Sequence, residues 1–187
     1  MVIAAIQPVG YHAWGNANKV ALFVLGEPHT LQLADVRSGA GMHVAEDVGR
    51  SLAKIPGRAG ISFMKRTDAE TWWIKELNVA SRRVKPIVEA LPESQDYAWT
   101  PDRSLLMATG STVHHWNGHG AWQPVADFAE QGLTAITRMA VSPDGKWLAM
   151  VVDEASPEAE TEAEAPETDR DASEDDEPDY PRKPMLF

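Results

Sequence analysis

The sequence predicts an all-β fold, namely a β-propeller built from four-stranded antiparallel blades. Residues 142–151 (SPDGKWLAMV) place a Pro-Asp-Gly turn before an apolar run, as in a β-hairpin. Similar segments occur at residues 12–23, 53–64, 97–108 and 139–150. With Trp14, Ile55, Trp99 and Val141 taken as equivalent, the spacings are 41, 44 and 42 residues. A period of about 40 to 45 residues is typical of propeller blades.

The remainder of each period also fits a blade. A third strand is expected at residues 30–34, 71–77 and 112–116, and a fourth at 42–45, 84–88 and 122–126. Polar turns separate these strands. A helical interpretation fails because Gly and Pro interrupt every window longer than about ten residues, and only residues 126–132 suit a helical turn. An unrelated β-sandwich is the alternative architecture.

The pattern divides the chain into two regions. Residues 1–152 form a partial propeller, with blades at about 9–46, 50–89 and 94–128 and an incomplete blade at 135–152. The last apolar run, residues 146–152, suits a strand covered on both faces, and residues 1–6 suit an outer strand of a further blade. Because an open repeat array leaves an apolar blade face in water, we expect self-association through such faces.

The distribution of charge along the chain bears on the kind of partner it can bind. Residues 153–187 carry 14 of the 28 acidic residues and three basic ones, so this acidic low-complexity tail accounts for the formal net charge of −11. The tail suits a solubilising role, and its last eight residues, YPRKPMLF, suit a contact motif. Residues 1–152 are neutral and offer no basic stripe, so a nucleic-acid surface is not expected.

Compartment signals are few. The absence of cysteine excludes disulfides and thiolate zinc sites. The longest apolar run, residues 20–25, is too short for membrane insertion, and residues 1–6 lack the pattern of a signal peptide.

The repeated segments resemble a known family. SPDGKWLAMV and WTPDRSLLMA look like the WD-repeat-like units of TolB-type six-bladed propellers, and the runs at residues 8–14 and 94–102 are similar to bacterial proteins of that group. The resemblance covers residues 1–152, about three and a half blades where it would imply six. It implies a periplasmic or secreted location and does not specify an activity.

Catalytic motifs are missing from the sequence. It contains no G-x-S-x-G, no G-x-x-x-x-G-K-[ST] and no H-E-x-x-H. His114, His115 and His119 form the one histidine cluster, but adjacent residues of a strand point to opposite faces, so no metal site is predicted there. The tryptophans, such as Trp14, Trp72 and Trp116, are expected to pack between blades. No cofactor is expected.

The starts of the first strands are the predicted site. In a propeller these strands line the central channel. In the register above, Tyr11, Leu52, Asp96 and Arg138 share one level, and His12, Ala53, Tyr97 and Met139 share the next. We predict a polar channel mouth that holds a small ligand or a peptide terminus, formed by Tyr11, His12, Asp96, Tyr97 and Arg138. The alternative is that Asp96 and Arg138 form a structural salt bridge between blades.

These observations favour a non-catalytic propeller scaffold that binds a protein partner, or a small ligand, through its blade faces and channel mouth. The second hypothesis follows from the resemblance of such propellers to the gating domains of serine peptidases of the prolyl-oligopeptidase type. In that case the catalytic part is absent from this chain. A propeller enzyme with a metal in its channel is a third possibility. Such a metal would need several inward-facing carboxylates or histidines at one height along the channel. The register offers only Asp96 and His12 near that height.

Overall fold

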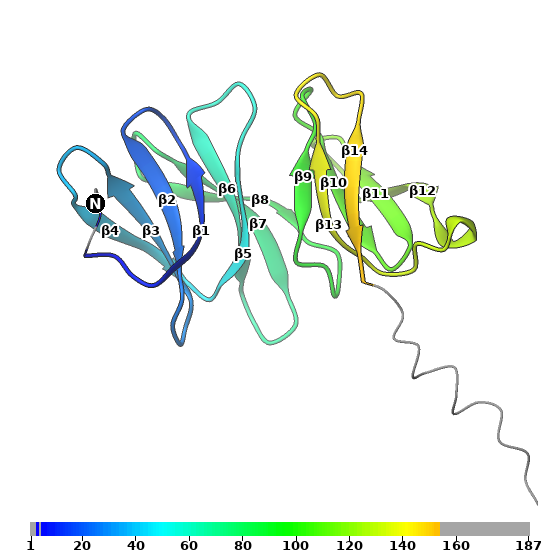
Figure 1. Ribbon diagram of the computed structural model, residues 1–187, viewed down its shortest axis with the longest axis horizontal. Helices are drawn as coiled ribbons and strands as arrows, with labels where there is room; N and C mark the ends of the chain where they lie inside the picture. Colours follow the sequence, from blue (N-terminus) through cyan, green and yellow to red (C-terminus); the bar gives the residue numbers. More distant parts are fainter. Residues whose placement is uncertain (1–2, 4, 154–187) are drawn as a thin grey trace, which may run out of the picture. The chain divides into compact units, whose positions relative to one another are not determined.

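The computed structural model describes residue 3 and residues 5–153. Within these residues, fourteen strands form three four-stranded antiparallel sheets and one two-stranded sheet (Figure 1). The chain therefore folds as a partial β-propeller, as the repeat pattern predicted. Apart from Asp153, the acidic tail expected at residues 153–187 lies outside the described residues.

Each sheet is one blade, with its strands in sequence order. The first blade contains β1 (Val9–Trp14), β2 (Lys19–Val24), β3 (Thr30–Asp35) and β4 (Gly41–Glu46). The second contains β5 (Val48–Lys54), β6 (Gly60–Arg66), β7 (Trp72–Asn78) and β8 (Val84–Glu89). The third contains β9 (Tyr97–Trp99), β10 (Leu105–Thr109), β11 (Thr112–Trp116) and β12 (Gln123–Asp127), and the fourth contains β13 (Ile136–Val141) and β14 (Leu148–Val152). A 3-10 turn, η1 (Ala129–Gln131), lies between β12 and β13, where a helical turn was expected.

The first strands of the blades lie next to one another, because β1 contacts β5, β5 contacts β9, and β9 contacts β13. Because the first strands of propeller blades line the central channel, we call this row of strands the channel wall. The apolar core lies between the blades in separate clusters. Phe63 and Leu77 pack toward the first blade, Met64 and Ile74 pack toward the third, and residues of β6 and β7 are buried on both faces as a result.

The packing shifts the predicted register of the second blade by one residue. Ala13, Ala53 and Ala98 each face the next blade, so these three alanines are equivalent. Lys54 therefore corresponds to Trp14, and the Ile55 assignment was wrong. Ser51, not Leu52, consequently shares the level of Tyr11. Since strand side chains alternate between faces, this one-residue shift exchanges the two faces of β5.

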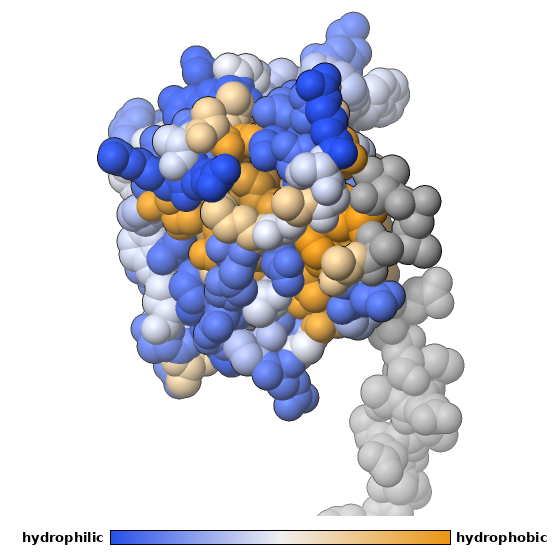
Figure 2. All heavy atoms as spheres, turned by 90° about the vertical axis from the view of Figure 1, so that its left-hand side faces the viewer, coloured by the Kyte–Doolittle hydropathy of each residue, from blue (hydrophilic) through white to orange (hydrophobic). Residues whose placement is uncertain are grey.

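The N-terminal segment covers the outer face of the first blade. Ile6, with partly buried Ile3 beside it, packs on Val20, Leu22 and Val24, which point away from the second blade. Gly41 makes this contact possible, because a Cβ there would clash with Ile6 Cδ1. Figure 2 shows apolar side chains gathered across this side. The expected outer strand at residues 1–6 is not present among the described residues, where the first strand begins at Val9.

Nothing within residue 3 and residues 5–153 covers the opposite end of the array. Residues of β14 alternate between half-buried and exposed, so the prediction that residues 146–152 form a strand covered on both faces was wrong. Leu148, Met150 and Val152 pack toward the third blade, whereas Trp147 is 76% exposed and Val151 is 54% exposed. These two side chains lie on the face of the fourth blade that, in each of the first three blades, packs against the following blade. We call this surface the open face.

No helix among the described residues is long and apolar enough to cross a membrane.

Candidate functional site

The candidate site lies where the first strands of the blades begin. Tyr11 of β1, Ser51 of β5, Asp96 before β9 and Arg138 of β13 share one level of the channel wall, given the corrected register. We call these four residues the mouth. Three of them were in the predicted set, and Ser51 was hidden by the one-residue shift of the second blade.

Arg138 links the fourth blade to the first across this level. Its Nη2 donates a hydrogen bond of 3.0 Å to the Tyr11 hydroxyl, and its guanidinium carbon lies 5.4 Å from the centroid of the Tyr11 ring. This hydrogen bond, followed by the positive charge of Arg138, lowers the pKa of Tyr11 below its ordinary value, and the charge of Arg50 acts in the same direction. The positive charges of Arg138 and Arg50 therefore both act on the Tyr11 hydroxyl.

Asp96 joins three blades through its carboxylate. Ser51 donates to Oδ1 at 2.5 Å from the second blade, and the backbone N–H of Met139 donates to Oδ2 at 2.9 Å from the fourth. The salt bridge considered between Asp96 and Arg138 is not among the ion pairs of the described residues. Arg138 donates to the exposed Tyr11 instead. Asp96 connects the first strands of neighbouring blades through its hydrogen bonds to Ser51 and Met139.

The other two predicted residues lie elsewhere. Tyr97 is 4% exposed and donates to Ser62 Oγ at 2.8 Å between the second and third blades. His12 pairs with Leu22, whose side chain lies on the outer face of the first blade, so His12 shares that face. The structure brings together Tyr11, Asp96 and Arg138, and it separates His12 and Tyr97 from them.

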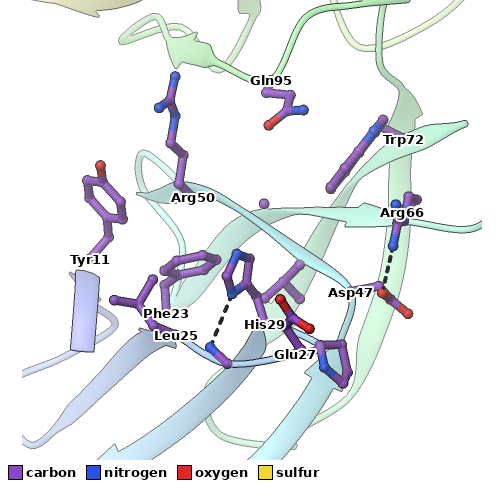
Figure 3. Close-up of a pocket in the computed structure, with 14 residues that line it drawn as sticks. Tyr11, Phe23, Leu25, Glu27, His29, Asp47, Arg50, Arg66, Trp72 and Gln95 are labelled. Atoms are coloured by element: carbon purple, nitrogen blue, oxygen red, sulfur yellow. Dashed lines mark hydrogen bonds and ion pairs between the residues drawn. The ribbon is translucent and has the colours of Figure 1, made fainter. Parts of the chain in front are cut away.

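A cavity of about 640 Å³ opens beside the mouth, between the first and second blades. Tyr11 forms part of its wall, and Figure 3 shows Arg50 and Trp72 on other sides of the same space. The Phe23 ring packs between the two aromatic residues Tyr11 and His29, with centroid distances of 5.8 and 5.0 Å. An aromatic floor thus lies next to charged groups.

Only some of the charged side chains that line the cavity form ion pairs. Arg66 forms an ion pair of 3.0 Å with Asp47 and lies 5.9 Å from the Trp72 ring centroid. Arg50 is exposed and takes part in none of the ion pairs among the described residues. Glu27 also lines the cavity and forms none of these ion pairs, so one guanidinium and one carboxylate are unpaired there. The Arg50 guanidinium is therefore available to an incoming anion, and Arg138, beside the cavity, donates to Tyr11.

Sequence reasoning missed Arg50 and Trp72 as parts of this site. Arg50 precedes Ser51 in β5, where the strand pairing is irregular between Val48 and Leu52. A bulge of this kind cannot be read from apolar periodicity. The run of residues 71–77 did predict β7, but the pattern gave no indication that Trp72 would line a cavity.

The two adjacent histidines of the cluster lie on opposite faces of β11. Within residue 3 and residues 5–153, no group of three His, Asp or Glu side chains is arranged to hold a metal ion. His114 pairs with Met107 and His115 with Leu106 on β11, so the two rings point to opposite faces, as predicted.

The lowered pKa of Tyr11 gives a first prediction. Replacing Arg138 with Gln removes the guanidinium and its charge, so the pKa of Tyr11 should rise toward its ordinary value. A spectrophotometric titration of tyrosinate absorbance measures this, because the chain has only three tyrosines. Arg37→Gln is the control, since Arg37 lies in an exposed turn. An identical titration curve for Arg138→Gln and the wild type would contradict the contact.

Comparisons with known proteins bear on the fold. No protein-family model and no curated protein matches this chain. Among solved structures, the chain is similar to TolB from Acinetobacter baumannii, with 17% identity and a TM-score of 0.54, over 78% of this chain and 38% of that chain. This similarity shows the fold, which is a partial β-propeller. A structure described as YCF48 bound to D1 peptide is similar at 16% identity and a TM-score of 0.49, over 77% of this chain and 46% of that chain.

The resemblance to TolB-type propellers is thus confirmed at the level of the fold. The chain spans less than half the length of either propeller structure.

Proposed function

We propose that this partial propeller is a non-catalytic recognition scaffold whose mouth binds a protein partner through a carboxylate, either a peptide C-terminus or an acidic side chain. The observation that carries the proposal is the position of Arg138 and Arg50, whose charges both act on Tyr11 beside the 640 Å³ cavity. Guanidinium groups bind carboxylates through paired, charge-assisted hydrogen bonds.

The supporting shell of the mouth favours recognition. Asp96 holds the second, third and fourth blades together through Ser51 and Met139, so partly buried hydrogen bonds between blades hold the strands that carry the two arginines. A site fixed on rigid strands loses little entropy when a ligand binds. The aromatic floor around Phe23 would contact the apolar part of a bound peptide.

An array of random octapeptides tests the proposal. Each peptide is displayed once with a free C-terminal carboxylate and once as the amide, and the array is probed with the dye-labelled full chain. We expect a preference for free carboxylates, for peptides rich in Asp or Glu, or for both. Arg138→Ala should weaken the strongest signals about tenfold or more, because a hydrogen bond between charged groups is lost.

The controls separate binding from stability. Arg37→Ala removes one exposed arginine far from the mouth and should leave the array signals unchanged. Urea unfolding of Arg138→Ala should show a change below about 1 kcal/mol, as expected for an exposed polar contact. If Arg138→Ala lowers the unfolding free energy and leaves peptide binding intact, the contact with Tyr11 is a structural seam and the proposal fails.

A further inference from the structure

A second cavity, of about 250 Å³, lies between the second and third blades at the opposite ends of the first strands. The β5–β6 turn contributes Arg58 and the β9–β10 turn contributes Arg103. We call it the basic pocket and define it by six of its lining residues: Arg58, Glu76, Lys85, Trp99, Arg103 and Trp116.

Positive charge exceeds negative charge in the basic pocket. Glu76, whose side chain is 8% exposed, lies 3.1 Å from Lys85 Nζ and 3.5 Å from Arg58 Nη1. One carboxylate therefore faces two cations, while Arg103 forms none of the ion pairs among the described residues. Two positive charges remain in excess, although residues 1–152 are neutral overall.

Two tryptophans with fixed side chains form the aromatic part of the wall of the basic pocket. Trp99 Nε1 donates to Ser62 Oγ at 2.7 Å, and Trp116 Nε1 donates to the Gly120 carbonyl at 3.0 Å. Both indole rings therefore have their polar groups satisfied within the fold. Their apolar surfaces are left to line the cavity.

Arg103 is an unusual residue at its position. Its φ of 71° lies in the left-handed region, and the corresponding residue of the fourth-blade turn, with the same φ of 71°, is Gly145. A residue with a Cβ is disfavoured there, and such exceptions concentrate at functional sites. Arg103 therefore occupies a position whose backbone conformation favours glycine, at the rim of the basic pocket.

We propose that the basic pocket binds a small dianion, a phosphate monoester whose flat apolar part lies against Trp99 and Trp116. The volume suits a ligand of that size and is below the usual range for larger molecules. Arg58, Lys85 and Arg103 supply donors to the phosphate, and Glu76 holds Arg58 and Lys85 in place.

Calorimetric titration of the full chain with phenyl phosphate tests this site, at constant ionic strength and above the second pKa of the phosphate. We expect saturable binding that inorganic phosphate competes away. Arg103→Gly should weaken it about tenfold or more, through the loss of a charged donor, without lowering Tm, because glycine suits the backbone there.

Arg82→Gly is the matched control, since Arg82 also has a positive φ, of 60°, and does not line the basic pocket. It should leave the affinity for phenyl phosphate nearly unchanged. The proposal is overturned if phenyl phosphate gives no saturable binding, if inorganic phosphate does not compete, or if both glycine variants weaken binding equally.

Discussion

Replacing Ser62 with alanine should lower the unfolding free energy by about 2 to 6 kcal/mol, or about 1 to 3 kcal/mol for each buried donor left without a partner. Ser62 is fully buried between the second and third blades. Its Oγ accepts hydrogen bonds from the Tyr97 hydroxyl at 2.8 Å and from Trp99 Nε1 at 2.7 Å. Burial raises the pKa of Tyr97, so its hydroxyl stays protonated and remains a donor.

Urea unfolding, followed by circular dichroism, measures this loss. A double-mutant cycle isolates its cause, because Tyr97→Phe removes one of the two donors. In that background Ser62→Ala should cost about 1 to 3 kcal/mol less than in the wild type. Ser38→Ala, in an exposed turn, should change the stability by no more than about 0.5 kcal/mol. Equal costs in both backgrounds would show that the hydrogen bond from Tyr97 is not a source of the effect.

The second large effect is expected at the open face. We expect the chain to self-associate through this face, and the double variant Trp147→Glu, Val151→Lys should make it monomeric or weaken its association about a hundredfold. Each large apolar side chain contributes about 1.5 to 3 kcal/mol when fully buried, and 1.4 kcal/mol corresponds to about a tenfold change in Kd. Trp147 and Val151 are the most exposed large apolar side chains of β14 and the turn before it.

Sedimentation velocity over a range of concentrations measures the association. Val125→Lys is the matched control, because Val125 is 56% exposed and Val151 is 54% exposed, yet Val125 lies on β12, the outermost strand of the third blade. The control should associate like the wild type. A wild-type chain that sediments as a monomer at all concentrations would refute the role of the open face.

The sequence was sufficient for the architecture. The spacing of the Pro-Asp and Pro-Gly turns set the repeat, and the predicted third and fourth strands lie within two residues of the observed ones. Local turn chemistry and apolar runs determine where strands start and stop, because both act over a few neighbouring residues. The partial propeller could therefore be read from the chain alone.

The site depended on contacts between blades, which no local pattern encodes. The pairing irregularity in β5 placed Arg50 and Ser51 at the channel wall. Tyr97, one residue after Asp96, turned into the core to meet Ser62. Because strand side chains alternate with a period of two, a shift of one residue decides whether a group faces a ligand or a neighbouring blade.

The first and fourth blades also separate what the sequence predicts from what only the packing decides. Apolar runs identified β2 and β14 as strands, but only the packing showed that Ile6 covers the first blade and that one side of β14 remains exposed. Hydropathy along a strand records how much burial its residues favour, whereas the tertiary structure decides which neighbour, if any, provides it.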